Sequence, residues 1–223
     1  MTDSRLQQLE AVAGAVSRET FEALLGFEAI FLKWATQINL TSPSQLPKLW
    51  DRHILDSAQL LRLAPAASQW VDFGSGGGFP GAILAILLSD RPGSRVRLVE
   101  SNRKKAAFLQ SALAHVEIAE ILPRRIEDAV DAIGTAEIIT ARALAPLPQL
   151  LQWSEPWLTR GSRALFMKGR EFGVEVQESR DRWDFDLVEH RSRTNRAGIV
   201  LEISNLRPKA AGKASKKVHS ARP

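Results

Sequence analysis

Residues 72–81 read Asp72-Phe73-Gly74-Ser75-Gly76-Gly77-Gly78-Phe79-Pro80-Gly81, and this stretch decides the fold of the 223-residue chain. A short apolar run, 70–73, leads into it, and a strong helix-forming run, 82–88, follows it. A strand, a glycine turn and a helix in this order begin a nucleotide-binding βαβ unit. Glycine permits positive φ and close approach of a ligand to the main chain, and the free N–H groups at the helix start then face that ligand.

Strands and helices alternate on the carboxyl side of this turn. Alternation of this kind predicts an α/β fold, with a mostly parallel sheet covered by helices on both faces. The final two strands are joined by a hairpin at 191–198, so we expect the last strand to be antiparallel. The seven expected strands span 70–73, 95–100, 117–122, 136–141, 163–167, 185–190 and 199–206, and the expected helices span 81–88, 103–114, 127–133, 148–158 and 171–183.

The residues before the turn are expected to form a helical extension. Apolar side chains at 21–34 recur near a 3.6-residue period, and a further helix is expected from about Leu46 to Leu63. His53 and Asp56 lie on one side of that helix and are predicted to meet. We expect three segments: an N-terminal helical extension at 1–64, a core at 65–206 and a basic tail at 207–223.

Composition excludes several classes of function. The chain has no cysteine, so disulfides, thiolate metal sites and thiolate catalysis are excluded. No apolar run is long enough to span a membrane, and the N-terminus shows no signal peptide, so a cytoplasmic location is expected. The net charge of +5 comes mostly from the tail, since without its six basic residues 24 remain against 25 acids. The tail is either a solubilising end or an arm for nucleic-acid phosphates, which leaves a non-catalytic RNA-binding protein as one alternative.

Two patterns compete within the glycine stretch. Gly76-x-Gly78-x-x-Gly81 fits a dinucleotide site, and an NAD-dependent oxidoreductase is therefore an alternative. Asp72-x-Gly74-x-Gly76-x-Gly78 fits S-adenosylmethionine methyltransferases, and only this register places a glycine directly after the strand. Asp72 would repel a pyrophosphate but suits a cofactor with a sulfonium and an ammonium. Glu100 ends the second strand and can accept hydrogen bonds from both ribose hydroxyls in either case.

Further candidates follow the third, fourth and fifth strands. The loop Arg125-Ile126-Glu127-Asp128 is expected at the adenine edge, with the choice between Glu127 and Asp128 open. Arg142 is a candidate for guanine O6 or for the cofactor carboxylate, and Lys168 has a similar but weaker claim.

The methylated atom is constrained by what the chain lacks. The fourth strand has no Asn/Asp-Pro-Pro-aromatic stretch of the kind that holds an exocyclic amine. Methylation of pyrimidine C5 needs a cysteine nucleophile, which is absent. Guanine N7 has an available lone pair and needs no general base, so alignment is sufficient for transfer. These observations permit N7 without selecting it.

The chain closely resembles the bacterial small-subunit rRNA guanine-N7 methyltransferases of the RsmG (GidB) family over about residues 27–206. The pieces that carry the resemblance are Trp34, Asn39-Leu40-Thr41, Arg52-His53-Ile54-Leu55-Asp56-Ser57, the stretch 72–81, Lys105, Phe108-Leu109, Ala141-Arg142-Ala143 and Lys168-Gly169. The upstream Arg-His-Ile-x-Asp-Ser makes the match far more specific than a glycine pattern alone. The tail after Leu206 lies outside the resemblance.

The resemblance implies a class I Rossmann-like methyltransferase fold and methylation of guanosine 527 N7 in 16S rRNA, as free RNA or in a small-subunit particle. S-adenosyl-L-methionine would be the cofactor, with no metal and no membrane partner, and we expect a monomer. Cofactor contacts are implied at Gly74, Gly76, Gly78, Phe79, Glu100, Ile126, Glu127 and Arg142. Substrate positioning is implied for Arg142, Asn39, His53 and Lys168.

Overall fold

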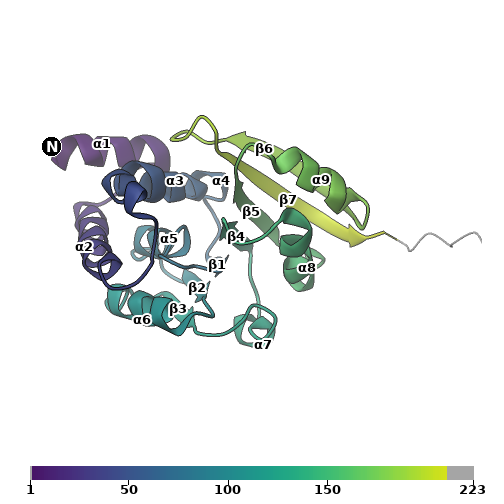
Figure 1. Cartoon of the computed structure of the whole chain (residues 1–223), viewed down its shortest axis with the longest axis horizontal. Helices are drawn as coiled ribbons and strands as arrows, with labels where there is room; N and C mark the ends of the chain where they lie inside the picture. The colour runs from purple at the N-terminus through teal and green to yellow at the C-terminus, as the bar shows by residue number, and fades with distance from the viewer. Residues whose placement is uncertain (1, 210–223) are drawn as a thin grey trace, which may run out of the picture.

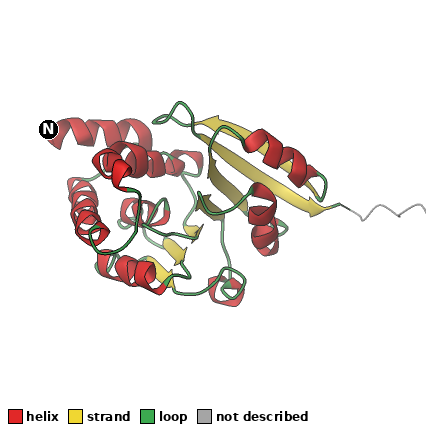
Figure 2. Ribbon diagram, viewed as in Figure 1, coloured by secondary structure: helices red, strands yellow, loops and turns green. Residues whose placement is uncertain are grey.

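A single seven-stranded sheet forms the centre of the molecule, and the computed structural model describes residues 2–209. Figure 1 shows the sheet between two groups of helices, and Figure 2 shows the long hairpin that closes it. The strands are β1 (Gln69–Phe73), β2 (Arg95–Val99), β3 (Ala119–Leu122), β4 (Ile138–Arg142), β5 (Arg163–Lys168), β6 (Trp183–Arg191) and β7 (Ile199–Pro208).

The strand order is β3-β2-β1-β4-β5-β7-β6. The five strands from β3 to β5 run parallel, and β7 pairs antiparallel with both β5 and β6. The order reverses beside β1, where β2 and β4 flank it. A crevice at the carboxyl ends of strands is the usual ligand site of such a sheet at this switch point. The predicted fold class, including the antiparallel last strand, is therefore confirmed.

Helices cover both faces of the sheet. One face packs α5 (Gly81–Leu87), α6 (Arg103–Ala112) and the N-terminal helices, and the other packs α7 (Val130–Ile133) and α8 (Leu147–Leu158). The helix α9 (Phe172–Arg180) lies against α8 and β6 (Figure 1). The strands β1 and β4 are buried on both faces, which is typical of central parallel strands.

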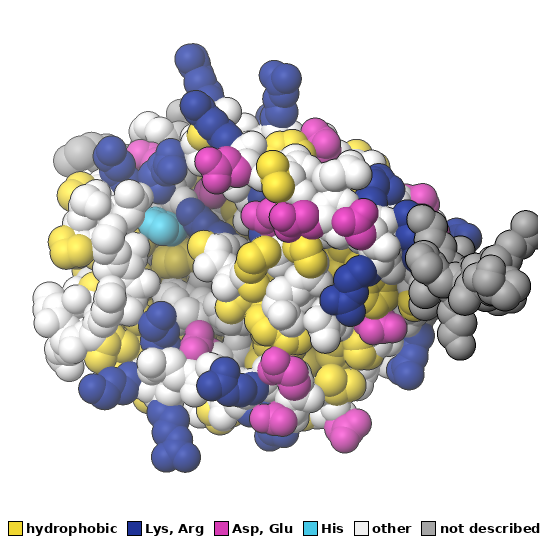
Figure 3. Space-filling view, turned by 45° about the vertical axis from the view of Figure 1, so that its right-hand side comes forward, with side chains coloured by type: hydrophobic (Ala, Val, Ile, Leu, Met, Phe, Trp, Pro, Cys, Tyr) yellow, Lys and Arg dark blue, Asp and Glu magenta, His cyan; other side chains and the backbone are white. Residues whose placement is uncertain are grey.

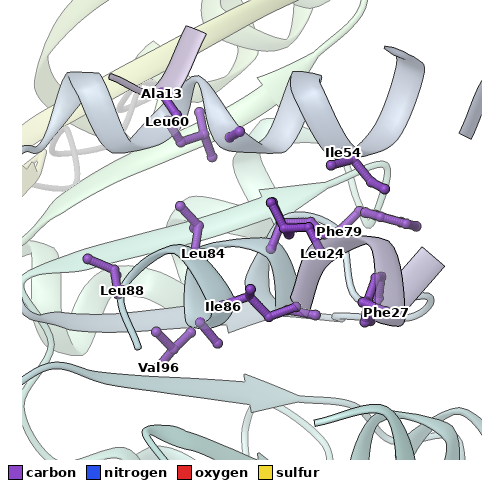
Figure 4. Packing of buried hydrophobic residues seen from close by; sticks show 14 of the residues in the cluster. Ala13, Leu24, Phe27, Ile54, Leu60, Phe79, Leu84, Ile86, Leu88 and Val96 are labelled. Carbon is purple, nitrogen blue, oxygen red and sulfur yellow. The ribbon is translucent and has the colours of Figure 1, made fainter. Parts of the chain in front are cut away.

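The N-terminal helices share one core with the sheet. They are α1 (Thr2–Ala13), α2 (Arg18–Ala35), α3 (Leu55–Ala58) and α4 (Leu60–Leu63). Leu24 and Phe27 of α2 lie in the same buried cluster as Leu84 of α5 and Val96 of β2 (Figure 4). Ser17 caps α2 by accepting a hydrogen bond from Thr20 N at 3.1 Å. The extension is thus packed into the core rather than appended to it.

The helix expected from Leu46 to Leu63 is not continuous. A 3-10 turn spans Pro43–Lys48, a π-helical turn spans Trp50–Ile54, and the short helices α3 and α4 follow. Pro47 explains the first break, since proline lacks an N–H and disfavours the α conformation of the residue before it. A π-helical turn is often found at functional sites, and this one carries His53.

The last strand is longer than predicted. It extends to Pro208, so the first residues of the expected tail belong to the sheet. The rest of the expected tail, 210–223, lies outside the described residues. None of the helices within 2–209 has the length and apolarity that a membrane span requires.

Candidate active site

Two clefts meet at the carboxyl ends of the parallel strands. The glycine-turn cleft has a volume of about 290 Å³ and is lined by Gly74, Gly76, Glu100, Ile126 and Glu127, among others. The strand-end cleft, of about 480 Å³, lies over β4 and β5 and is lined by Arg142 and Lys168, among others. Both clefts are lined by Ala143 and Leu144, so this pair forms the wall between them. The molecular surface in Figure 3 shows a hollow with a histidine and basic side chains at its edge.

Gly74 brings the main chain of the turn against that wall. Its φ is +63°, and a Cβ built there would lie 2.4 Å from Leu144 Cδ1. The positive φ favours glycine, and a larger residue would also have to displace the Leu144 side chain. The turn is fixed to its neighbours by hydrogen bonds from Ser75 N to Val99 O at 3.1 Å and from Gly78 N to Ser75 O at 2.6 Å.

Glu100 is buried at the end of β2 and joins two loops. Its Oε2 accepts a hydrogen bond from Gly76 N at 2.8 Å, and its Oε1 accepts one from Asn102 N at 2.7 Å. An ionised carboxylate has about four acceptor positions, so each oxygen keeps capacity for one more donor. The carboxylate also lines the cleft, where a pair of ribose hydroxyls would be such donors.

Asp72 does not face the cleft, so the interpretation that it faces a cationic cofactor is wrong. Its side chain is 1% exposed and accepts hydrogen bonds from Gly81 N at 3.1 Å and from Thr140 Oγ1 at 2.8 Å. Burial raises the pKa of Asp72 to about 6, although these hydrogen bonds oppose the rise. The carboxylate fastens the glycine turn to α5 and β4.

The loop after β3 contributes Glu127 rather than Asp128 to the cleft lining. Glu127 Oε1 accepts a hydrogen bond from the indole Nε1 of Trp153 at 2.8 Å, and Trp153 lines the same cleft from α8. The buried Ile126 lies beside them as the apolar part of this wall. A flat base placed here would meet an aromatic ring, an apolar side chain and a carboxylate.

Lys168 is placed in the strand-end cleft, as expected, but it is already paired. Its Nζ contacts Glu175 Oε2 at 2.6 Å and donates a hydrogen bond to Ala145 O at 2.7 Å. The same Glu175 oxygen accepts a hydrogen bond from Leu147 N at 2.6 Å. Lys168 and Glu175 therefore hold the loop 143–147, which includes the wall between the two clefts.

Arg142 ends β4 and points toward the π-helical turn. Its Nη2 donates a hydrogen bond to Arg52 O at 2.7 Å and lies 3.6 Å from Asp56 Oδ2. Burial lowers the pKa of Arg142, with Asp56 opposing that effect. Its Nη1 is buried and has no hydrogen-bond partner within residues 2–209, so it can donate a hydrogen bond to a carboxylate or carbonyl oxygen of a ligand.

His53 does not meet Asp56 by a hydrogen bond. Its ring instead packs against Phe79, with ring centroids 4.9 Å apart, and its Nε2 is buried without a partner in the described part of the chain. Burial and the nearby Arg142 lower the pKa of His53 to about 4. The imidazole is thus neutral at neutral pH.

Four predicted site residues, Asn39, His53, Gly78 and Phe79, lie outside the linings of the two clefts. Asn39 lines a separate groove with Lys104 and Lys105, apart from Arg142 and Lys168. The Phe79 side chain packs with Phe27 and Phe31, and a Cβ at Gly78 would meet Ala82 and Phe27. The roles of these residues toward ligands stay predictions.

Sequence reasoning missed several residues that build these clefts, namely Trp153, Glu175, Ser192 and Asn195. They stand outside the motifs, and only the fold brings them to the strand ends. Within residues 2–209, no group of His, Asp and Glu side chains is arranged to hold a metal ion.

Comparisons with known sequences agree with this arrangement. The family described as "GidB: rRNA small subunit methyltransferase G" matches residues 20–198. A relative from Chelativorans sp. (strain BNC1), named "Ribosomal RNA small subunit methyltransferase G", is 57% identical over 208 residues, covering 93% of this chain and 99% of the relative. A relative of the same name from Brucella anthropi is 51% identical over 210 residues, covering 94% and 99%.

Solved structures with a similar fold are distant in sequence. An O-methyltransferase from Bacillus cereus in complex with SAH superposes with a TM-score of 0.55 at 15% identity, covering 92% of this chain and all of that one. The O-methyltransferase TomG from Streptomyces achromogenes, in complex with SAM, has a TM-score of 0.55 at 17% identity, with 85% and 91% covered. At this level of identity the likeness concerns the fold.

Proposed function

This chain belongs to the GidB family of small-subunit rRNA methyltransferases, and we propose that it transfers a methyl group from S-adenosylmethionine to guanine N7 of guanosine 527 in 16S rRNA. The observation that carries the proposal is the family match over residues 20–198, together with relatives at 51–57% identity along more than nine-tenths of the chain. The relatives' names indicate the RNA, and the chemistry of this chain's residues supports N7.

The glycine-turn cleft suits the adenosine part of the cofactor. Glu100 offers two oxygens with spare acceptor capacity at the place where ribose hydroxyls would lie. Ile126, Glu127 and Trp153 form a wall for the adenine, with Trp153 fixing the Glu127 carboxylate. S-adenosylmethionine supplies an electrophilic methyl group when bound. The remaining task of the protein is to align that methyl group with a nucleophile.

The strand-end cleft suits the target base, because it shares the Ala143–Leu144 wall with the glycine-turn cleft. Guanine N7 carries an in-plane lone pair, so no residue has to remove a proton before attack. Arg142 Nη1 has no hydrogen-bond partner within residues 2–209, so it can donate to an oxygen of either ligand. His53 lies outside both cleft linings, and its lowered pKa keeps it uncharged at neutral pH. The site thus favours alignment over acid–base catalysis.

The proposal is tested by incubating the protein with labelled S-adenosylmethionine and with small-subunit RNA or particles that lack the modification. We expect label on N7 of one guanine, mapped by the sensitivity of N7-methylated guanosine to strand cleavage. Label on an exocyclic amine, on a pyrimidine or on protein would refute the N7 assignment. Thermal unfolding with NAD and with S-adenosylhomocysteine provides a second readout, and we expect only the latter to raise the melting temperature.

A further inference from the structure

The loop between β6 and β7, residues 192–198, forms one side of the strand-end cleft. Ser192, Asn195 and Gly198 line that cleft opposite Arg142 and Lys168. The loop therefore lies where RNA flanking the target base has to pass, if the proposed function holds. A hairpin that only closed the sheet would not need to reach this position.

A buried carboxylate on α3, that of Asp56, fastens the loop to the N-terminal helices. Asp56 Oδ1 accepts hydrogen bonds from Ser192 Oγ and Thr194 Oγ1, both at 2.8 Å, and from Gln59 Nε2 at 2.7 Å. Gln59 Oε1 in turn accepts a hydrogen bond from Arg193 N at 2.9 Å. Asp56 and Gln59 are 6% and 4% exposed. The loop is thus held by interior contacts more than 130 residues distant in sequence, which fixes its shape before any ligand arrives.

The fastened loop presents positive charge without compensation. Arg193 and Arg196 are exposed, and so is Arg52, whose Nη1 reaches Asn195 Oδ1 at 3.1 Å. No ion pair to any of the three is found among residues 2–209, and the segment 192–198 contains no acid. The exposed Asp51, beside Arg52, and the exposed Glu189, before Arg193, form no ion pair within the described residues. A guanidinium presents a planar fork of donors that matches phosphate geometry.

We propose that the β6–β7 loop is a docking element for the phosphate backbone of the RNA substrate, shaped in advance by Asp56 and Gln59. This inference rests on the proposed function for its partner. Arg193, Arg196 and Arg52 bind phosphates on the rim of the strand-end cleft, while the cleft itself receives the base. Pre-ordering by the Asp56 contacts lowers the entropy that is lost when the RNA binds.

The test compares RNA binding by the double variant R193A/R196A with the intact protein across salt concentrations. The probe is a fluorescent 16S rRNA fragment that contains the candidate guanosine. We expect about tenfold weaker binding at low salt. The negative slope of log K against log salt should also become shallower by about 1.4, since each lost phosphate contact to single-stranded RNA contributes about 0.7.

The matched control is R160A/R182A. This variant removes two exposed arginines that precede β5 and β6, at the end of the strands opposite to the loop. An unchanged slope in R193A/R196A, or an equal loss in the control, would overturn the proposal. Affinity for S-adenosylhomocysteine should be the same in all three proteins. If the intact protein binds RNA through the loop but transfers no methyl group, the proposed function fails and the docking element stands.

A second variant tests the fastening. Thr194→Val removes one hydrogen bond to Asp56 and leaves every charge in place. RNA binding should weaken about threefold with the salt slope unchanged, because order is lost but phosphate contacts are not. Thr36→Val serves as the control, because it removes an exposed hydroxyl whose one hydrogen bond among residues 2–209 is to Lys33 O. Equal affinities for T194V and the intact protein would show that Asp56 does not shape the loop for binding.

Discussion

The two clefts at the strand ends are built in different ways. The glycine-turn cleft is lined mainly by residues that follow β1, β2, β3 and β4, with Trp153 from α8, and Glu100 bonds directly to backbone N–H groups. The strand-end cleft is held by side-chain pairs such as Lys168–Glu175 and Arg142–Asp56, and by a hairpin loop from the far end of the chain. Changes in the first cleft therefore act on the backbone, whereas changes in the second act on the placement of side chains.

The largest effect is expected for Glu100→Ala in the glycine-turn cleft. The variant loses the acceptor for ribose hydroxyls and leaves Gly76 N without its partner, so cofactor affinity should fall by about 2–4 kcal/mol in calorimetry. Glu137→Ala is the matched control, because Glu137 likewise accepts backbone hydrogen bonds, from Ser68 N and Gln69 N, but at the opposite end of β1. It should lower stability and leave cofactor affinity unchanged. Equal cofactor affinity for both variants would show that Glu100 does not bind the cofactor.

Gly81→Ala tests the backbone of the same cleft. A Cβ at this position would lie 2.6 Å from Asp72 Oδ2 and 2.7 Å from Asp72 Cβ, and the buried carboxylate cannot move away. We expect a loss of about 2–3 kcal/mol in the free energy of unfolding, measured in denaturant. Gly26→Ala, at an exposed position of α2 with open space, should instead stabilise by about 0.5–1 kcal/mol. A neutral Gly81→Ala would show that the turn and α5 are loosely joined.

A smaller effect is expected in the strand-end cleft for Glu175→Gln. The amide keeps its shape but no longer compensates Lys168, whose side chain is 10% exposed. Stability should fall by about 1–2 kcal/mol. Methyl transfer should slow about tenfold at saturating cofactor, because the loop 143–147 shifts. Glu171→Gln, at an exposed neighbouring position, is the control. If cofactor affinity fell more than the rate, the supposed separation of the two clefts would be incorrect.

The smallest effect is expected on the pH dependence of stability, to which His53 and Asp72 contribute with opposite signs. The pKa of His53 is lowered from 6.5 to about 4, so between these values the unfolded chain binds a proton that the folded chain rejects, and stability falls as pH decreases. Asp72, with its pKa raised from 3.8 to about 6, acts in the opposite direction, and its contribution is lost as pH rises through 6.

Replacing His53 with Gln should therefore reduce the loss of stability between pH 7 and pH 5. The difference from the intact protein should be about 1 kcal/mol or less, since the ring is only partly shielded from water. Denaturant unfolding at the two pH values provides the measurement. A loss of the same size in both proteins would mean that His53 takes up a proton in the folded state.

The fold and the glycine-turn cleft could be predicted because they depend on local order in the sequence. Apolar runs, the glycines and Glu100 at the end of a strand are spaced by the βαβ unit itself. The position of Asp72 could not be predicted because both faces of β1 are buried, and the residue type does not tell that its carboxylate binds Gly81 N and Thr140 Oγ1 rather than a ligand. The predicted continuous helix over Leu46–Leu63 is wrong because the apolar periodicity does not show the break at Pro47.

The strand-end cleft could be predicted only in part. Arg142 and Lys168 could be identified as candidates because each is the last residue of a strand. Their partners Asp56 and Glu175, and the loop at 192–198, join them through contacts across the fold that follow no sequence period. Trp153 lies on α8, and nothing in the sequence distinguishes it from an aromatic residue that only packs against the sheet.

Phe79 links the glycine turn to the N-terminal helices, with ring centroids 5.9 Å from Phe27 and 5.4 Å from Phe31. A cofactor that restricts the turn therefore also restricts α2, and the coupling free energy between the two is the same in both directions. A ligand whose binding to α2 is coupled to the turn would change cofactor affinity by the same factor by which the cofactor changes the affinity of that ligand. The Phe79 ring, with the apolar side chains around it, thus makes the glycine turn and the helices before residue 65 one mechanical unit.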